Sequence, residues 1–318
     1  MSELWGTYNI PLVNEISWKN SSILARASVD EVYNQIISDL IDAENRLADN
    51  FIVGKNQRII PNRWAASALL ARVYLYTKDW SKAEMESSSV ISNSAMFGLV
   101  SFPNNVFKTN STETIWQLQQ SNTTGTYNAT NEGYRIIPYD ATSRPYIYLT
   151  DTLIRSFEPG DNRRTFWIDS TIYRSAKYYY PNKYKTGPAQ SMPNGPYNEY
   201  YMVLRLAEQY LIRGEARLMQ NNLTEAINDL NTIRQRAGIN PLPNSLTQQQ
   251  VLEAIEQERR VELFAEWGHR WLDLKRWGKA DAVLAHIKGG NWQSTDQLYP
   301  IPFRELQANP NLIQNPGY

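Results

Sequence analysis

The chain has 318 residues, enough to bury a large core in one big domain or two modest ones. Its 32 basic residues (Lys and Arg) balance its 32 acidic ones, so the composition disfavours nucleic acid, an anionic membrane or another polyanion as a partner. The absence of cysteine excludes disulfides, thiolate metal sites and a cysteine nucleophile. No uncharged apolar stretch reaches the roughly 18 residues of a membrane-spanning helix.

The first predicted elements are helices. In residues 28–49 apolar residues recur every three or four positions, and Ser28 with Glu31 forms a capping box. Residues 62–92 then predict two antiparallel helices joined by a short turn, the second with Ser81 as its N-cap. Alanines in the first of these helices allow a close approach of the two.

Residues 97–198 have a different composition, dominated by glycine, proline, asparagine, threonine and tyrosine. Short pieces at residues 114–120 and 134–139 have the pattern of strands. Long structured loops on a rigid helical scaffold commonly carry binding sites. We therefore expect the ligand site in this loop-rich excursion.

A second helix pair is predicted at residues 199–238. Its first helix covers residues 199–219, and Gly238 ends its second helix. Both pairs place small residues where helices meet, which is the logic of tetratricopeptide repeats. We expect residues 1–318 to form a single, mainly α-helical domain of such pairs, with the excursion as a loop-rich insertion that carries short strands.

The stretch "IEQERRVELFAEWGHRWLDLKRWG" combines dense charge with tryptophans. It predicts a helix over residues 247–264 and, after a break at Gly268, a short helix over residues 269–277. Opposite charges three or four positions apart predict ion pairs along these helices. Glu258 and Glu262 can be interpreted as a glycosidase pair or as members of a structural ion-pair network, and the adjacent arginines favour the network.

Other chemical signatures are weak. His269 and His286 are the only histidines and neither has a plausible second nitrogen ligand nearby, so we expect no metal site and no histidine-centred triad. The "DNRR" of residues 161–164 predicts a turn with internal Asp–Arg pairing, the alternative being a grip on a carboxylate or phosphate. No glycine-rich phosphate loop is present, and we expect no cofactor.

Six blocks resemble, in the same order, the SusD/RagB family of Bacteroidetes outer-membrane nutrient-binding lipoproteins. They are "ARASVDEVYNQIISDLIDAE" (25–44), "RWAASALLARVYLYTKDWSKAE" (63–84), "VLRLAEQYLIRGEARL" (203–218), "LNTIRQRAG" (230–238), "ERRVELFAEWGHRWLDLKRWG" (258–278) and "LYPIPFRELQANPNLIQNPGY" (298–318). The resemblance covers nearly the whole chain.

The resemblance implies a helical scaffold of tetratricopeptide-like pairs, with an irregular part that holds the ligand, in a protein that is not an enzyme. Family members lie on the outer face of the outer membrane as lids on a TonB-dependent SusC-type transporter, and they capture glycans or, in some branches, peptides. They begin with a signal peptide, a lipidated cysteine and further helices. We therefore expect this chain to be the C-terminal two thirds of a longer protein whose lipid anchor lies in the missing part.

Sugars present apolar faces and hydroxyl edges, so a sugar site needs exposed rings beside polar groups. The family has no fixed motif for its sugar contacts, and candidates come from the composition of the excursion alone. The candidate ligand-binding residues are Tyr127, Asn128, Tyr134, Tyr139, Trp167 and Tyr173.

Three functional hypotheses follow. The first is non-catalytic capture of glycans at the cell surface for delivery to a SusC-like transporter. The second is a helical-repeat adaptor that binds a protein segment, or a peptide-importing branch of the family. The third is a glycoside hydrolase that uses Glu258 and Glu262. A nucleic-acid partner is expected in none of them.

Overall fold

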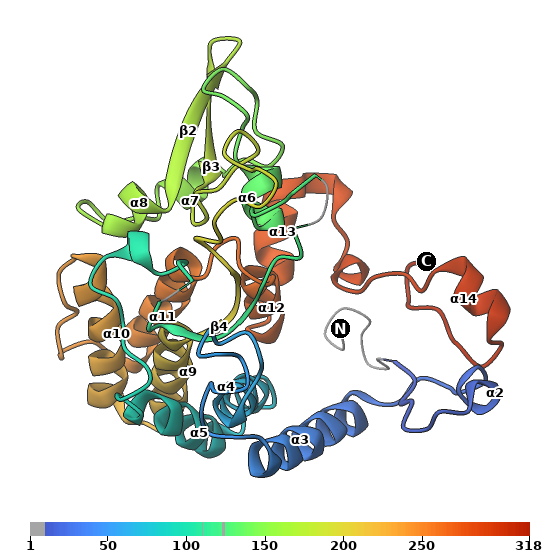
Figure 1. Cartoon of the computed structure of the whole chain (residues 1–318). Coiled ribbons are helices and arrows are strands. Elements are labelled where there is room, and N and C mark those ends of the chain that lie inside the picture. Colours follow the sequence, from blue (N-terminus) through green and yellow to red (C-terminus); the bar gives the residue numbers. More distant parts are fainter. Residues whose placement is uncertain (1–9, 110, 123–124) are drawn as a thin grey trace. The chain divides into compact units, whose positions relative to one another are not determined.

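The computed structural model describes residues 10–109, 111–122 and 125–318, and these residues are mainly helical with a few short strands, as predicted (Figure 1). The chain divides into two compact units, Ile41–Trp267 and the combination of Met1–Leu40 with Gly268–Tyr318. The single domain over residues 1–318 stays a prediction.

The larger unit is built on two helix pairs. They are α4 (Arg63–Tyr76) with α5 (Trp80–Ser92), and α9 (Leu206–Met219) with α10 (Leu223–Ala237). Helix α9 packs against both α10 and α5, and α11 (Gln248–Glu262) packs against α9 and α10. Gly214 allows α9 to approach α10 closely, because a Cβ at this position would lie only 3.4 Å from the Cβ of Asp229. Fully buried leucines and isoleucines such as Leu211, Leu230 and Ile255 fill the space between these three helices.

Local sequence signals predicted several helix ends correctly. The capping box of Ser28 and Glu31 is present at the start of α3 (Val29–Arg46), and Gly238 adopts the left-handed conformation that ends α10. The expected N-cap Ser81 is wrong. Asp79 caps α5 instead, because its carboxylate accepts the backbone N–H of Lys82 and the helix begins one residue before Ser81.

Two predicted elements have the wrong secondary structure. The segment before α9 is not helical but forms strand β4 (Tyr201–Arg205), because its backbone pairs antiparallel with β1 (Thr114–Leu118), the strand expected at residues 114–120. The strand expected at residues 134–139 is also wrong. Helix α6 (Asn131–Ile136) occupies part of it, since Thr130 accepts the backbone N–H of Gly133 and caps that helix.

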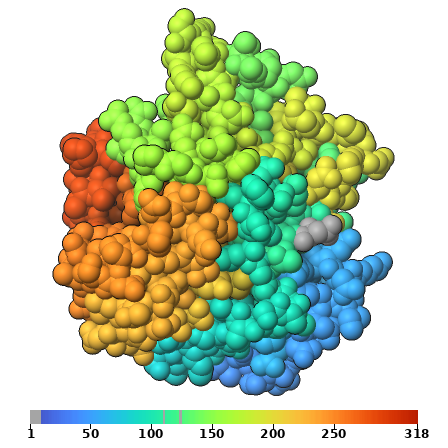
Figure 2. Space-filling model, turned by 90° about the vertical axis from the view of Figure 1, so that its left-hand side faces the viewer, coloured from blue at the N-terminus to red at the C-terminus, as the bar shows by residue number. Residues whose placement is uncertain are grey.

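The excursion contains a β-hairpin of β2 (Ile168–Tyr173) and β3 (Ala176–Pro181). Arg174 and Ser175 form its turn with φ of 48° and 67°, the left-handed conformation of tight hairpin turns. The hairpin stands out from the helices of the larger unit in Figure 1, and Figure 2 shows green residues of the preceding loop beside it. Besides α6, the excursion contains the short helices η1 (Pro103–Asn105), α7 (Asp151–Ile154) and α8 (Asn162–Phe166).

The smaller unit contains short helices. They are α2 (Trp18–Ser21), α12 (His269–Arg276), α13 (Ala280–Lys288), η2 (Gly289–Asn291), η3 (Ser294–Gln297) and α14 (Phe303–Ala308). Gly268 precedes α12 with φ of 73°, which confirms the predicted break, and the expected pair of Asp273 and Arg276 is present at 2.8 Å. Over the residues described, no helix has both the length and the apolarity needed to cross a bilayer.

Candidate ligand-binding site

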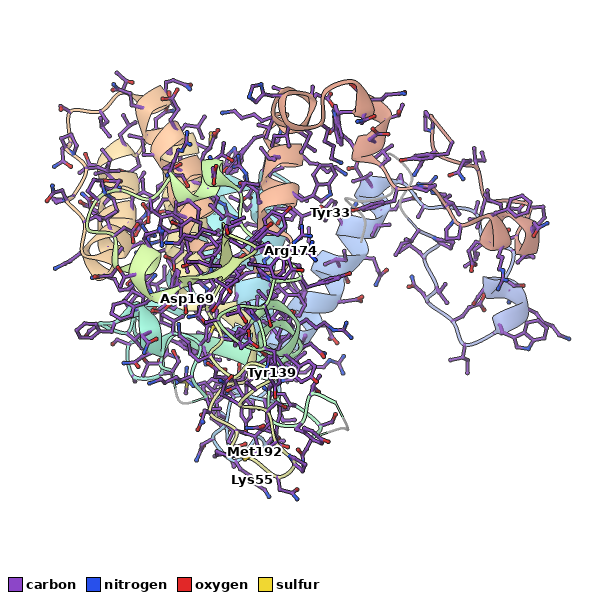
Figure 3. All side chains as sticks on the ribbon, turned by 90° about the horizontal axis from the view of Figure 1, so that it is seen from above. Tyr33, Lys55, Tyr139, Asp169, Arg174 and Met192 are labelled. Atoms are coloured by element: carbon purple, nitrogen blue, oxygen red, sulfur yellow. The ribbon has the colours of Figure 1, made fainter. Side chains whose placement is uncertain are left out.

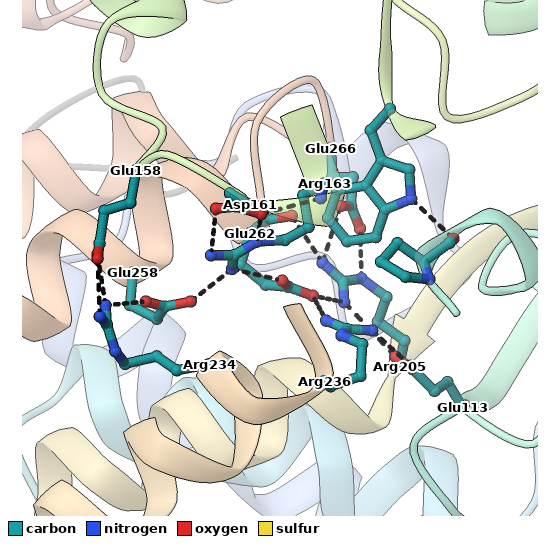
Figure 4. A network of polar contacts seen from close by, with 12 residues as sticks. Glu113, Glu158, Asp161, Arg163, Arg205, Arg234, Arg236, Glu258, Glu262 and Glu266 are labelled. Carbon is teal, nitrogen blue, oxygen red and sulfur yellow. Dashed lines mark hydrogen bonds and ion pairs between the residues drawn. The ribbon is translucent and has the colours of Figure 1, made fainter. Parts of the chain in front are cut away.

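The charged stretch of α11 lies in the core of the larger unit (Figure 4). Glu258 is 2% exposed and Glu262 is fully buried. Arg163 reaches both carboxylates, 3.0 Å from Glu262, and Arg205 lies 2.5 Å from Glu262. Arg236 also pairs with Glu262. This confirms that the stretch forms a structural ion-pair network.

The partners in the network differ from the expected ones. Sequence spacing predicted pairs within the helix, but the arginines that neutralise Glu262 come from α8, β4 and α10. Arg205 also pairs with Glu266 at 2.8 Å. The spacing of charges along a helix can predict ion pairs only between residues of that helix. On a fully buried face, the charged partners come from the elements that pack against it.

The "DNRR" segment is part of the same network. Asp161 accepts the backbone N–H of Arg163 at 2.9 Å and pairs with its guanidinium at 2.8 Å, which confirms the turn with internal Asp–Arg pairing. The remaining donors of Arg163 face Glu258 and Glu262. All three guanidinium nitrogens of Arg163 therefore donate to carboxylates inside the protein.

The charges in the network control the protonation of its acids. Burial alone would raise the pKa of Glu262, but Arg236, Arg205, Arg163 and Lys183 outweigh it and hold that pKa well below its usual range. For Glu258 burial prevails over Arg163 and raises the pKa. A glycosidase pair needs an open cleft around its two carboxylates, whereas these two lie buried against arginine.

The described residues contain no group of three or more His, Cys, Asp or Glu side chains that could hold a metal ion. The excursion contains a cavity of about 680 Å³. Its lining includes Lys108, Asn128, Lys185, Gln190, Asn198 and Glu199.

Several polar groups of this cavity hold its walls in place. The carboxylate of Glu199 accepts the backbone N–H groups of Lys185 at 2.6 Å and Thr186 at 2.9 Å, and burial raises its pKa. The ammonium of Lys185 donates to the carbonyl oxygens of Phe166 and Asn182, both at 2.5 Å, and burial lowers its pKa to about 8. These groups order the cavity wall, because their hydrogen bonds go to the protein itself.

Other lining groups remain available to a ligand. The side chains of Lys108, Gln190 and Asn198 are exposed at the cavity, and of these the Gln190 side-chain oxygen also accepts the backbone N–H of Gly187 at 3.2 Å. Ammonium and amide groups donate and accept hydrogen bonds, which suits the hydroxyl edge of a sugar or the backbone of a peptide.

The structure separates the six candidate residues. Asn128 belongs to the cavity wall, where its amide donates to the Pro196 carbonyl and accepts the N–H of Met192, each at 2.9 Å. Trp167 is fully buried, and its indole N–H donates to the Pro103 carbonyl at 2.8 Å. The prediction that Trp167 stacks on a ligand is therefore wrong, because the ring is a core residue packed against Phe107 and Phe264.

The four tyrosines of the set differ in exposure. Tyr139 is 68% exposed and can offer its ring to a ligand, whereas Tyr127, Tyr134 and Tyr173 are half-buried. Tyr139 can be located in Figure 3, together with Asp169 at the base of the hairpin and Arg174 in its turn. Asn128 lines the cavity, whereas Tyr173 lies on the hairpin and is not among the described residues that line the cavity.

Sequence reasoning missed two exposed rings in the loop before the hairpin. Tyr146 is 85% exposed and Tyr148 is 48% exposed. Thr171 of β2 holds this loop, because its hydroxyl donates to the carbonyls of Ala141 at 2.5 Å and Ser143 at 3.1 Å. The close spacing of tyrosines in "RPYIYL" was the available signal, but only the folded hairpin shows where the loop lies.

Comparisons with known proteins agree with this architecture. Residues 161–318 match a model described as the SusD family, and residues 1–75 match one described as starch-binding associating with outer membrane. SusD-like protein P2 of Formosa agariphila is 29% identical over 93% of this chain and 66% of its own length. The starch-binding protein SusD of Bacteroides thetaiotaomicron is 33% identical, but over only 36% of this chain and 21% of its own.

Solved structures show the same fold. A SusD superfamily protein of Bacteroides vulgatus has a TM-score of 0.83 at 22% identity, over 100% of this chain and 74% of that one. A structure titled laminarin binding SusD-like protein has a TM-score of 0.78 at 25% identity, over 99% of this chain and 75% of that one. With 66% of one curated relative and 70% of two others covered, this chain spans about two thirds of their length. From its sequence, its relatives and its fold, the chain belongs to the SusD/RagB family.

Proposed function

We propose that this protein captures glycans without altering them and presents them to a SusC-type TonB-dependent transporter on the outer face of the outer membrane. The observation that carries this proposal is the display of exposed tyrosine rings by the excursion of a rigid helical scaffold. Tyr139 and Tyr146 are the most exposed of these rings. Aromatic faces of this kind stack on the apolar faces of sugars.

Two further observations support glycans as the ligand class. Relatives of this chain are named for binding starch and laminarin. The cavity of the excursion also offers exposed amide and ammonium groups within a wall ordered by Glu199 and Lys185. The excursion thus supplies both exposed rings and hydrogen-bonding groups, which match the apolar face and the hydroxyl edge of a carbohydrate.

Affinity electrophoresis in gels that contain laminarin or starch tests the proposal. We expect the wild-type protein to be retarded in at least one gel, and Tyr139→Ala with Tyr146→Ala to weaken the retardation several-fold. Phe303→Ala is the matched control, because it removes an equally exposed ring from α14, outside the excursion. Its retardation should equal that of the wild type.

Product analysis separates binding from catalysis. Bound oligosaccharides should be recovered intact, with no new reducing ends. Retardation by no glycan, together with binding of peptides, would favour a peptide-importing branch of the family. Release of reducing ends that Glu258→Gln abolishes would require an enzyme instead.

A further inference from the structure

One face of the β2–β3 hairpin gathers arginine and tyrosine. In the register of the hairpin Thr171 lies opposite Tyr178 and Tyr173 opposite Ala176, so the side chains of these four residues share one face. Tyr173 and Tyr178 are diagonal neighbours on that face. The hydroxyl of Thr171 donates to the carbonyl of Ala141 and so holds the loop before the hairpin against this face. Side chains of that loop therefore extend the same face.

Arg144 is the cation that the loop supplies. Its guanidinium lies 5.6 Å from the ring centre of Tyr148 and 5.4 Å from that of Tyr178. The two rings meet edge to face with centroids 5.2 Å apart. This contact with two rings restricts the guanidinium, which lowers the entropy lost when it binds an anion.

Arg144 has no acidic partner in the described part of the chain. It is exposed and takes part in no ion pair there. The nearby carboxylate of Asp140 accepts from the backbone and hydroxyl of Thr142, both at 2.8 Å, and from the hydroxyl of Ser143 at 3.0 Å. The acid of this loop is therefore used by its own turn, and the guanidinium keeps its donors for a ligand.

A second cation extends the face toward the turn of the hairpin. Arg174 is exposed, its guanidinium lies 5.3 Å from the ring centre of Tyr173, and it too lacks an ion pair in the part of the chain that the structure describes. The one carboxylate on this face of the hairpin strands, Asp169, lies at the other end of β2, opposite Tyr180. The charge of the face is thus positive around Arg144 and Arg174.

From this arrangement we infer that the face formed by Arg144, Tyr148, Tyr173, Arg174 and Tyr178 binds the acidic sugars of an anionic glycan. The inference rests on the proposed function and names its substrate class. A guanidinium pairs with two oxygens of a carboxylate or sulfate group at once, while adjacent ring faces take the apolar side of a sugar. The balanced charge of the whole chain conceals this local excess of cations.

Binding of four polymers tests the inference. Polygalacturonate carries carboxylates, dextran sulfate carries sulfates, laminarin is a neutral glycan, and polyglutamate is an anion without sugars. We expect Arg144→Gln to weaken binding of polygalacturonate, dextran sulfate or both by about tenfold or more, the size of a lost charge-assisted hydrogen bond. Binding of laminarin should change less than twofold.

Two further variants test whether the effect is specific to Arg144 and its supporting rings. Arg304→Gln removes the same charge from an exposed position on α14 and should leave all four affinities unchanged. Tyr148→Ala keeps the charge of Arg144 but removes one of its two supporting rings, and should weaken binding of the acidic glycans several-fold. Higher salt should weaken binding of acidic glycans and not that of laminarin. Circular dichroism checks that each variant is folded.

The outcomes separate the two proposals. Binding of laminarin alone, with none of either acidic glycan, would overturn this inference and leave glycan capture standing. Polyglutamate bound as tightly as the acidic glycans, or acidic glycans bound equally by wild type and Arg144→Gln, would also overturn it. Absence of binding to every glycan would reject the proposed function and this inference together.

Discussion

Arginine and aromatic residues occur together in two regions of the larger unit, and they behave in opposite ways. In the core, Arg205 and Arg236 lie over the ring of Trp167, and Glu262 with its neighbours neutralises both cations. On the hairpin and the loop before it, Arg144 and Arg174 lie on tyrosines and have no carboxylate partner in the described chain. Burial and ion-pair partners, not residue type, therefore decide whether such a cluster holds helices together or leaves its cations exposed to solvent.

The largest expected effect is on the buried network. Glu262→Gln should destabilise the protein by about 3–5 kcal/mol in urea unfolding, because it leaves the charges of Arg205 and Arg236 without their shared carboxylate. Glu253→Gln, at an exposed position of the same helix, is the matched control and should cost less than about 0.5 kcal/mol.

A loss below about 1 kcal/mol for Glu262→Gln would contradict the clamping role. The pH dependence gives a second check. Because the pKa of Glu262 is held well below 4.5 in the folded state, its contribution to stability is present above about pH 4.5 and is lost as the pH falls through the folded pKa. Glu262→Gln should therefore lose less stability than the wild type on acidification below pH 4.5.

A smaller effect is expected where a buried acid of the scaffold has a neighbour of the same charge. Burial and the charge of Glu44 raise the pKa of Glu86 to about 7. The folded protein therefore binds more protons than the unfolded chain between about pH 4.5 and 7, so this residue makes stability rise as the pH falls through that window. Glu86→Gln should raise the melting temperature at pH 8 by about 2–4 °C, and at pH 5 much less.

Melting curves at the two pH values measure this difference. Glu84→Gln, on the same helix but paired with Arg217 at 2.8 Å, is the contrasting variant and should not raise the melting temperature at pH 8. An equal gain for Glu86→Gln at pH 5 and pH 8 would mean that the carboxyl does not titrate in this window.

The smallest expected effect on stability belongs to the hairpin. Arg144→Gln should change the free energy of unfolding by less than about 0.5 kcal/mol, because an exposed cation on two rings contributes little to folding. Urea unfolding checks this beside the binding measurements. A loss as large as that of Glu262→Gln would remove the distinction between the two regions.

Most of the fold could be predicted from the sequence, because helix signals are local. The capping box of Ser28, the break at Gly268 and the end of α10 at Gly238 depend on residues within a few positions of each other. The helical prediction failed at Tyr201–Arg205 because that segment pairs with β1, more than 80 positions earlier in the sequence. Such pairing has no local signature.

The candidate site was predicted only in part. Tyr139 is exposed and Asn128 lines the cavity, but the ring of Trp167 is in the core and the exposed rings of Tyr146 and Tyr148 were missed. Composition shows that a segment is rich in rings, yet it does not show which rings the surrounding core covers.

The helical class, the long helices and the resemblance to one family could be predicted from the sequence, because periodicity, caps and ordered motifs depend on residues that are close together along the chain. The fold alone shows that arginines from three other elements neutralise Glu262, and that Arg144 lies on two tyrosines without a described acidic partner. The physical reason is that charge pairing and exposure depend on distances in space, which the fold sets between residues far apart along the chain.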